Sequence, residues 1–546
     1  MGIAEGLVAW PDELAKRYRE QGYWNGMALG HYLWRSAELF GEKEALTDGE
    51  RRLSYQQLAA LSDGLALGLA ERGYRSGDCM VVQLPNCWEF VVLLFACARI
   101  GVIPIMALPG HRSHEVSYFV EHSGARAIAV ADEIKGFDHQ GMAREIARGS
   151  NAVQDVFVLG ENVRTGSVDL GKLIVSPRDV NGVRHRLDEM GPCSDSVALF
   201  LLSGGTTGLP KLIPRSHDDY GYNFRQSAEV CGFDERTVYL VSLPASHNFP
   251  LACPGLLGVL YAGGRVVMAR SPEPENCLNL IGKERVTVAS AVPAVAQRWL
   301  EAKIQKPHYD LSSLEIIQVG GARMAPELAS RVRPVLGCTL QQVFGMAEGL
   351  INYTSLDASE EVICETQGKP MSPADEVLIV DDHDVPVPDG EMGQLLTRGP
   401  YTLRGYFNAP EHNARSFTAE GWYRTGDVVR WHSSGNLVVE GRTKDLINRA
   451  GEKVSAEEVE NLLYRLPSVA QVAAIAIPDK NLGERTCAVV VMKNGASNLT
   501  LAEVRSAMEG FGVAKYKFPD QLELVESLPT TNVGKIDKAL LRSKFS

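Results

Sequence analysis

The sequence predicts an α/β protein with a large N-terminal part and a small α+β domain at its C-terminus. Apolar, strand-like runs alternate with helical segments over most of the chain, which is typical of largely parallel, buried sheets. The residue pattern changes near 430–445. The length, 546 residues, is also more than one ordinary hydrophobic core accommodates, so we expect at least two domains.

The strand-like runs of the N-terminal part are short and continuously apolar. In chain order they are CMVVQLP, GVIPIMAL, AIAVA, ALFLLS, VYLVSLP, LLGVLYAGG, RVVMA, TVASAV and EIIQVG, while EFVVLLFACARI and PELASRVRPVL have helical character. The most apolar stretch, 90–108, contains Arg99, Gly101 and Pro104. A charge inside a lipid-facing helix costs about 2.5–3.5 kcal/mol. We therefore predict a buried helix over 88–99 and a buried strand over 102–107 instead of a membrane span.

The C-terminal part has a pattern of its own. GNLVVEGRTKDLINRAGEKVSAEEVENLL predicts a short strand, a charged polar segment and a helix. Beyond it we expect a helix over 455–465, strands over 471–477 and 487–493, and a helix over 501–510. We place the domains at 1–441 and 442–546. A short polar joint between unlike domains favours relative motion and a site between them.

Composition excludes several classes of protein. The net charge of −12 argues against a nucleic-acid scaffold, which needs a basic face. The N-terminus has neither the basic start nor the apolar core of a signal peptide. The ten cysteines include no C-x-x-C pair, so we expect no disulfide framework, no zinc site and a reducing, cytoplasmic location.

A glycine-rich loop, SGGTTGLPK, follows the strand-like run ALFLL. Glycines let backbone N–H groups surround phosphate oxygens, hydroxyl groups can donate, and a lysine supplies positive charge. The alternative is a surface turn between strands. The loop is not a Walker A sequence, because Pro precedes the lysine and Leu follows it. The candidate phosphate ligands are Ser203, Gly204, Gly205, Thr206, Thr207, Gly208 and Lys211.

A second stretch, SHNFPLACPG, places His247, Asn248 and Cys253 among apolar neighbours. Two interpretations are open. The three side chains are satisfied structural residues, since cysteine in particular packs well in cores, or they line a pocket for a small, mostly apolar ligand.

SGGTTGLPK resembles the nucleotide loop of the adenylate-forming superfamily, which includes acyl-CoA synthetases, luciferases and adenylation domains. Four further segments resemble that family's motifs and follow in its order: FGMAE at 344–348, YRTGD at 423–427, GRTKD at 441–445 and PTTNVGK at 529–535. Further segments resemble one group within that family, the stand-alone aryl-acid adenylating enzymes of siderophore assembly. These segments are LPNCWEF, GCTLQQVFGMAEGL, TQGKPMSP, LLTRGPYTLRGY and INRAGEKV.

The resemblance implies stacked α/β sheets in the large domain and a small mobile C-terminal domain. It also implies two reactions. An aryl carboxylate attacks the α-phosphorus of ATP, with Mg²⁺ as cofactor, and a phosphopantetheine thiol on a separate aryl carrier protein then attacks the aryl-AMP. The residues implied for ATP binding are the loop residues above with Gly321, Ala322, Val343, Phe344, Gly345, Met346, Ala347, Glu348, Asp427, Arg442 and Lys535.

Several of these residues have individual implied roles. Glu348 is the implied Mg²⁺ ligand, since a hard cation prefers carboxylate oxygen; from its type alone it could be a solvated glutamate. Asp427 accepts hydrogen bonds from the ribose hydroxyls. Lys535 bridges the attacking carboxylate and the α-phosphate, and Lys211 and His247 complete the implied catalytic set. Lys444 is the implied hinge between the two domain orientations.

The implied aryl-acid site contains Asn248, Phe249, Cys253, Gly320 and Leu350. Asn248 binds the carboxylate and the ortho hydroxyl, and Phe249 forms an aromatic wall. Relatives with serine at position 253 tend to activate 2,3-dihydroxybenzoate, and those with cysteine salicylate. A thiol is a larger and weaker donor than a hydroxyl, so Cys253 favours salicylate. Alternatives are 2,3-dihydroxybenzoate, a hydroxylated heteroaryl acid, an aryl-CoA ligase, or a binding protein that has lost catalysis. We expect no nucleic-acid or membrane partner.

Overall fold

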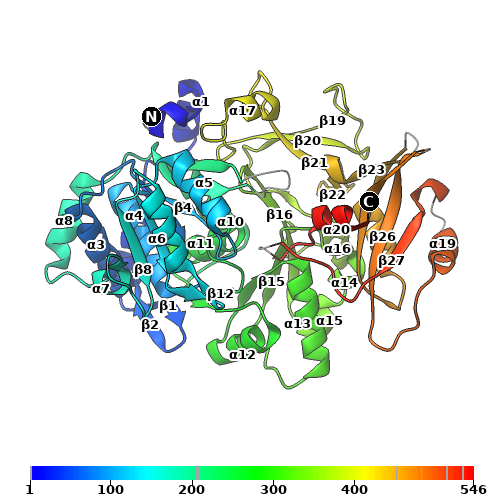
Figure 1. Ribbon diagram of the computed structural model, residues 1–546, viewed down its shortest axis with the longest axis horizontal. Helices are drawn as coiled ribbons and strands as arrows, with labels where there is room; N and C mark the ends of the chain where they lie inside the picture. The colour runs from blue at the N-terminus through cyan, green and yellow to red at the C-terminus, as the bar shows by residue number, and fades with distance from the viewer. Residues whose placement is uncertain are drawn as a thin grey trace.

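The computed structural model describes residues 3–203, 210–449, 452–480, 482–511, 514–531 and 534–545. Two large sheets form the N-terminal part (Figure 1). In spatial order, one sheet contains β11 (Leu212–Ser216), β10 (Val197–Leu202), β4 (Ile103–Met106), β3 (Cys79–Gln83), β5 (Ala127–Ala131), β8 (Asp155–Leu159) and β9 (Val168–Asp169). Its strands pair in parallel except for the antiparallel β10–β11 pair.

The other large sheet carries most of the candidate site. Its strands, in spatial order, are β18 (Lys369–Pro370), β17 (Gly349–Tyr353), β16 (Thr339–Met346), β15 (Ile316–Gly320), β14 (Val288–Ala291), β12 (Val238–Val241), β13 (Arg265–Met268), β1 (Glu44–Asp48) and β2 (Arg51–Ser54). The central pairs are parallel, and the strands at both ends are antiparallel. Apart from LLGVLYAGG, the predicted strands of the N-terminal part and their largely parallel arrangement are therefore confirmed.

A common hydrophobic core joins the two sheets through helices that lie between them. These helices are α2 (Leu29–Phe40), α3 (Tyr55–Glu71), α4 (Trp88–Ile100), α9 (His217–Val230) and α11 (Gly255–Ala262). α4 and β4 confirm the helix and strand predicted over 88–107. Arg99, within that stretch, is buried and pairs with Asp63, its Nε 2.7 Å from Oδ1. No helix in the described ranges is long and apolar enough to cross a membrane.

The remaining helices cover the outer faces or connect the sheets. They are η1 (Ile3–Gly6), α1 (Asp12–Glu20), α5 (Ser113–Ser123), α6 (His139–Gly149), α7 (Leu170–Leu173), α8 (Val180–Met190), α10 (Asn248–Ala252), α12 (Pro274–Glu284), α13 (Pro293–Gln305), α14 (Pro326–Ala329), α15 (Val332–Leu336), α16 (Glu360–Glu365) and α17 (Pro410–Ser416); β6 (Glu133–Ile134) and β7 (Phe137–Asp138) form a small hairpin. PELASRVRPVL gives two short helices because Pro334 cannot donate back to the preceding turn.

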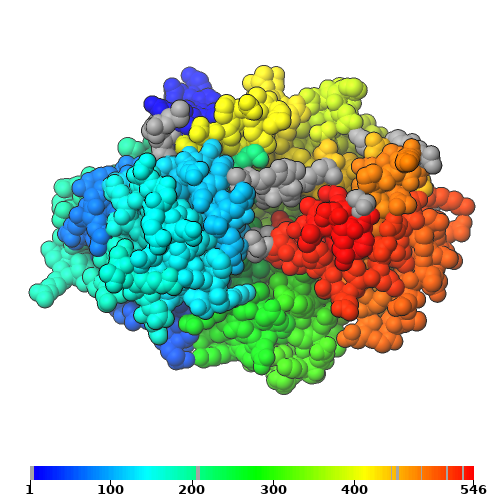
Figure 2. Space-filling model, viewed as in Figure 1, coloured from blue at the N-terminus to red at the C-terminus, as the bar shows by residue number. Residues whose placement is uncertain are grey.

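A smaller antiparallel sheet follows, with β19 (Glu376–Val380), β20 (Gly393–Arg398), β21 (Tyr423–Trp431) and β22 (Leu437–Arg442). After η2 (Thr443–Asp445), the chain enters a separate sheet formed by β23 (Leu446–Arg449), β24 (Glu452–Ser455), β25 (Val469–Asp479), β26 (Gly483–Met492) and β27 (Gln521–Leu524). α18 (Ala456–Tyr464), α19 (Leu501–Gly510), η3 (Lys515–Lys517) and α20 (Lys538–Phe545) complete this part. Figure 2 shows it, in orange and red, against the green and yellow segments.

Two local predictions were wrong. The run LLGVLYAGG, which we predicted as strand-like, forms α11, because a short, continuously apolar segment has no period that separates a strand from a buried helix. The polar segment after residue 442 contains the β23–β24 hairpin. Its pairing places Ile447 opposite Val454, and both side chains are fully buried in the C-terminal core.

Candidate active site

The glycine-rich loop leaves β10 and returns in β11. Its base is closed by two hydrogen bonds: the Ser203 backbone N–H donates to the Lys211 carbonyl over 3.0 Å, and the Lys211 N–H donates to the Ser203 hydroxyl over 2.9 Å. Gly204, Gly205, Thr206, Thr207 and Gly208 lie outside the described residues. The Lys211 ammonium is 5.9 Å from the centroid of the Tyr406 ring. Lys211 therefore lies beside the tyrosine that contacts Glu348.

Glu348 lies in the tight connection between β16 and β17. Its side chain is buried, and its Oε1 accepts a hydrogen bond from the Tyr406 hydroxyl over 3.0 Å. That hydroxyl is 2.9 Å from the hydroxyl of Tyr423. Burial raises the pKa of Glu348, while the Tyr406 hydroxyl and the nearby Arg442 act in the opposite direction. A bound cation would relieve the cost of burying this carboxylate.

The strand that leads to Glu348 carries the first residues of the FGMAE segment, and these residues differ in exposure. Val343 and Met346 are buried, Phe344 and Ala347 are half-buried, and Gly345 is exposed. The exposed Gly345 and the half-buried Phe344 lie near the C-terminal end of β16, next to the connection that carries Glu348.

Asp427 and Arg442 face each other on adjacent strands. Their Cα atoms are register partners in the β21–β22 pair, and Arg442 Nε lies 2.6 Å from Asp427 Oδ1. Asp427 is buried, and its charge raises the pKa of Arg442. The pair holds one carboxylate and one guanidinium in fixed positions near Glu348.

Lys535 reaches this group from the C-terminal part. A β-carbon placed on Gly321 would lie 3.1 Å from Lys535 Cε and 3.9 Å from Nζ, so the lysine side chain lies directly against the Gly321 backbone. In Figure 1 the red C-terminal segment reaches toward β15 before it continues into α20. Burial lowers the pKa of Lys535 to about 8, with Arg442 acting in the same direction and Asp427 and Glu348 against it.

His247 is the N-cap residue of α10. Its Nδ1 accepts a hydrogen bond from the Phe249 backbone N–H over 3.2 Å, so the neutral ring carries its proton on Nε2. Burial and the Lys535 ammonium lower the pKa of His247 to about 3. The imidazole is therefore neutral at physiological pH and can donate a hydrogen bond without adding positive charge.

Asn248, Phe249 and Cys253 are all buried and belong to α10 or its C-terminal end. Asn248 Nδ2 lies 3.4 Å from Cys253 Sγ. A β-carbon on Gly320 would lie 3.1 Å from the Phe249 ring and 2.9 Å from the Val343 carbonyl, so only glycine allows this close approach. Burial raises the pKa of Cys253 to about 12, which keeps it a neutral thiol.

The structure thus brings most of the predicted site together. Gly320 contacts the Phe249 ring, the adjacent Gly321 contacts Lys535, and Lys535 in turn lies near His247 and the Asp427–Arg442 pair. Leu350 packs in a different core cluster from Phe249 and Cys253, and Ala322, the residue after Gly321, is exposed. Lys444 lies in η2, and its side chain is outside the described part.

Sequence reasoning missed four buried residues that contact the site: Tyr406, Tyr423, Arg215 and Tyr220. Tyr423 begins the YRTGD segment, so its position was a usable signal. Arg215 and Tyr220 follow the glycine-rich loop directly. Tyr406 ends the segment LLTRGPYTLRGY, so its position was a usable signal too, although its contact with Glu348 depends on packing.

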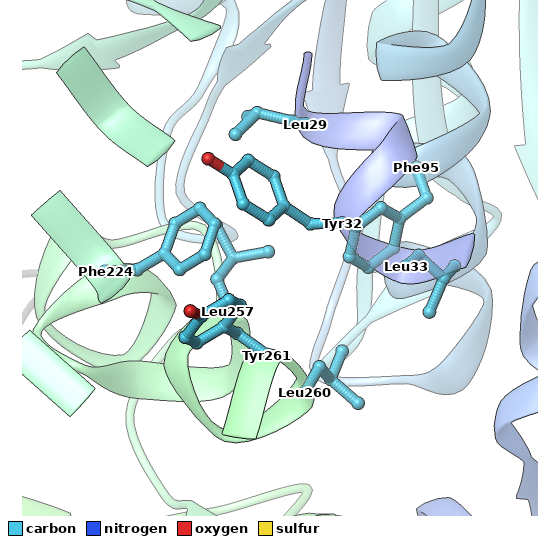
Figure 3. Close-up of a pocket in the computed structure, with 8 residues that line it drawn as sticks. All are labelled: Leu29, Tyr32, Leu33, Phe95, Phe224, Leu257, Leu260 and Tyr261. Carbon is cyan, nitrogen blue, oxygen red and sulfur yellow. The ribbon is translucent and has the colours of Figure 1, made fainter. Parts of the chain in front are cut away.

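A separate apolar cavity lies between α2, α4, α9 and α11 (Figure 3). Its lining residues are Leu29, Tyr32, Leu33, Phe95, Phe224, Leu257, Leu260 and Tyr261. It leaves room for little more than a water molecule, and no charged group lines it. This cavity therefore offers no chemistry of its own.

The fold, two stacked sheets with a smaller domain placed against them, is that of the adenylate-forming enzymes. Residues 33–407 match the AMP-binding enzyme family, and residues 458–535 match the AMP-binding enzyme C-terminal domain. The chain therefore belongs to the AMP-binding enzyme family, as its motifs predicted.

Three similar proteins show which members of the family this chain resembles. A Streptomyces protein named salicylyl-CoA synthase / salicylate adenylyltransferase is 59% identical over 98% of this chain and 97% of its own length. The 2,3-dihydroxybenzoate-AMP ligase of Bacillus subtilis (strain 168) is 48% identical over 100% of this chain and 98% of its own. The apo structure of Mycobacterium smegmatis MbtA is 44% identical, with a TM-score of 0.76, and covers 100% of this chain and 99% of that one.

Proposed function

We propose that this enzyme activates salicylate with ATP and then transfers the salicyl group to a thiol. A carboxylate oxygen of salicylate attacks the α-phosphorus, pyrophosphate leaves, and salicyl-AMP forms. A thiolate then attacks the acyl carbon, and AMP leaves. The names of the Streptomyces and Bacillus subtilis relatives support an aryl-acid substrate.

The observation that carries the proposal is the position of Lys535. Its side chain lies against Gly321, while the neighbouring Gly320 touches the Phe249 ring of the proposed acid site. A carboxylate bound at Phe249 and Asn248 would therefore meet the lysine where an α-phosphate must also lie. The ammonium would offset the repulsion between two anions, which is the main electrostatic barrier of the first reaction.

ATP would extend from this point past the C-terminal end of β16. The glycine-rich loop and Lys211 would hold the phosphates, Phe344 would lie against the adenine, and Asp427 would accept from the ribose hydroxyls with Arg442 beside it. Mg²⁺ is usually held by one or two carboxylates together with substrate phosphates. The buried carboxylate of Glu348 fits that role, and bound Mg²⁺ would neutralise phosphate charge there.

His247 would act as a neutral donor. Its Nε2–H can hydrogen-bond an oxygen of the acid or phosphate, and burial and the Lys535 ammonium, which lower the pKa of the ring to about 3, favour the neutral form. We infer that Lys211, Glu348, His247 and Lys535 together form the catalytic set.

Cys253 supports salicylate over 2,3-dihydroxybenzoate. The thiol lies beside the Asn248 amide in a fully buried position, and it would satisfy a second ring hydroxyl poorly. 2,3-Dihydroxybenzoate and hydroxylated heteroaryl acids are the alternatives.

For the acceptor we propose the phosphopantetheine arm of a separate aryl carrier protein. The name of the Streptomyces relative includes a CoA synthase activity, which supports coenzyme A as a second candidate acceptor. Both present the same pantetheine thiol, so the acid-activating step is common to them. ATP as a substrate is consistent with our expectation of a cytoplasmic location.

The second reaction needs the thiol to reach the acyl group, and Lys535 lies at the position it must approach. We therefore infer that residues 442–546 rotate against residues 1–441 about Lys444 between the two reactions. Lys444 lies in η2, which connects β22 of one sheet to β23 of the next, and this position suits a hinge.

ATP–pyrophosphate exchange with a panel of aryl acids tests the proposal. The panel would contain salicylate, 2,3-dihydroxybenzoate, benzoate and hydroxypicolinates. We expect the highest kcat/KM with salicylate. Absence of exchange with every aryl acid would overturn the function, and a preference for 2,3-dihydroxybenzoate would overturn the substrate assignment alone. Incubation of the enzyme and salicyl-AMP with coenzyme A, or with an aryl carrier protein that bears a free phosphopantetheine arm, would then distinguish the acceptors.

A further inference from the structure

Tyr220 lies on α9, behind the residues of the proposed acid site. Its side chain is fully buried, and its hydroxyl donates to Oδ1 of Asn248 over 2.9 Å. The same Asn248 amide directs Nδ2 to Cys253 Sγ at 3.4 Å. One end of the amide is thus occupied by Tyr220, and the other end faces the side chain at position 253.

This contact decides which way round the amide lies. A buried tyrosine hydroxyl needs an acceptor, and Oδ1 is the acceptor it has among the described residues. If the amide were flipped, Nδ2 would face the hydroxyl and the hydroxyl proton would lose that partner. An unpaired buried donor disfavours such an arrangement by roughly 5- to 150-fold. The contacts of the Cys253 thiol agree with this orientation of the amide. Its Sγ accepts from Asn248 Nδ2 and lies 3.5 Å from the Asn248 backbone carbonyl oxygen, to which the thiol can donate.

The Tyr220 ring is itself held in place by Arg215. The guanidinium lies 4.8 Å from the ring centroid, and its Nε is 2.7 Å from Asp219 Oδ1. Another guanidinium nitrogen donates to Asn223 Oδ1 over 3.3 Å, and the Asn223 amide donates to the Ala252 carbonyl at the end of α10 over 2.7 Å. The hydroxyl of Tyr220 therefore has little freedom to move away from Asn248.

We propose that Tyr220 is a positioning residue that makes Asn248 present an Nδ2–H group, and not its side-chain oxygen, to the aryl acid. This inference rests on the proposed function. Nδ2 carries two hydrogens, and Cys253 engages one of them, so the other can donate to a carboxylate oxygen. A flipped amide would place its carbonyl oxygen against the carboxylate and repel it. Tyr220 would thus select for an anionic acid without touching it.

Tyr220→Phe removes the hydroxyl and keeps the ring. We expect the KM for salicylate in ATP–pyrophosphate exchange to rise about tenfold, because the amide then samples both orientations, while kcat and the KM for ATP change little. Calorimetric binding of salicylate to the full chain should weaken by a similar factor. The matched control is Tyr222→Phe on the same helix, since that buried hydroxyl lies 2.6 Å from the Ser372 hydroxyl and away from Asn248.

A double-mutant cycle separates positioning from a general structural role. In an Asn248→Ala background, Tyr220→Phe should cause no further rise in KM, whereas a structural defect would add its full effect. If the wild type is active and Tyr220→Phe leaves the KM for salicylate unchanged, this inference alone is overturned. Additive effects of the two substitutions on KM would overturn it as well. A wild type that neither exchanges nor binds any aryl acid would overturn the proposed function and this inference with it.

Discussion

The side chain of Lys535 lies directly against the backbone of Gly321, with Cε 3.1 Å from the position that a β-carbon on the glycine would take. Gly321 has a φ of +83°, a backbone conformation that favours glycine. The absence of a side chain at this point leaves the space that the lysine occupies. Lys535 is thus held at the place where the proposed acid and nucleotide sites meet.

Lys535→Ala should abolish most adenylate formation and spare the second reaction. Loss of a charge-stabilising donor typically costs about 10²–10³-fold in rate, so we expect a fall of that size in ATP–pyrophosphate exchange. Thioester formation from supplied salicyl-AMP should retain much of its rate. Lys544→Ala, which removes a lysine from α20, the helix that follows Lys535, is the control. Equal losses in both reactions would contradict the role assigned to Lys535.

The pH dependence of the first reaction should reflect the same lysine. Burial lowers the pKa of Lys535 to about 8, so the ammonium is present below that pH and lost above it. We expect kcat/KM for ATP, which reports the free enzyme, to fall about tenfold per pH unit above pH 8. His247, with a pKa lowered to about 3, should contribute no acid limb near its usual pKa. A profile that stays flat to pH 10 would show that the lysine charge is not required.

Cys253→Ser should shift the preference among acids toward 2,3-dihydroxybenzoate. A serine hydroxyl can pair with the second ring hydroxyl, and satisfying a buried polar group changes preference by roughly 5- to 150-fold. The measurement is the ratio of kcat/KM values for the two acids. Cys97→Ser, at a fully buried cysteine in α4, controls for the cost of burying a hydroxyl. An unchanged ratio would remove Cys253 from the specificity site.

Lys444→Pro should separate the two reactions if η2 is the hinge. Proline fixes its own φ and restricts the residue before it, so the joint should be held in one orientation. We expect one half-reaction to be largely kept and the other to fall, each measured in a single-turnover assay. Lys444→Ala, which leaves the backbone free to rotate, should retain both. Two unimpaired half-reactions in the proline variant would place the hinge elsewhere.

Much of the scaffold could be predicted because its signals are local. Continuous apolar runs such as AIAVA and EIIQVG form strands with almost the predicted bounds. Arg99 and the glycine and proline after it correctly separated a helix from a strand in the most apolar stretch. LLGVLYAGG failed because a continuous apolar run of this length fits a buried helix as well as a buried strand.

The sequence by itself determined the order of the elements, the two-part α/β organisation and the identity of the candidate residues, since these depend on short-range patterns and motifs. Only the tertiary structure decided which residues meet in the site. The Asp427–Arg442 pair follows from strand register, Lys535 reaches Gly321 through the docking of the C-terminal part, and Tyr220 orients Asn248 through the packing of α9 against α10. Such contacts join residues far apart in the chain, and their geometry is set by how elements pack rather than by the periodicity of any one of them.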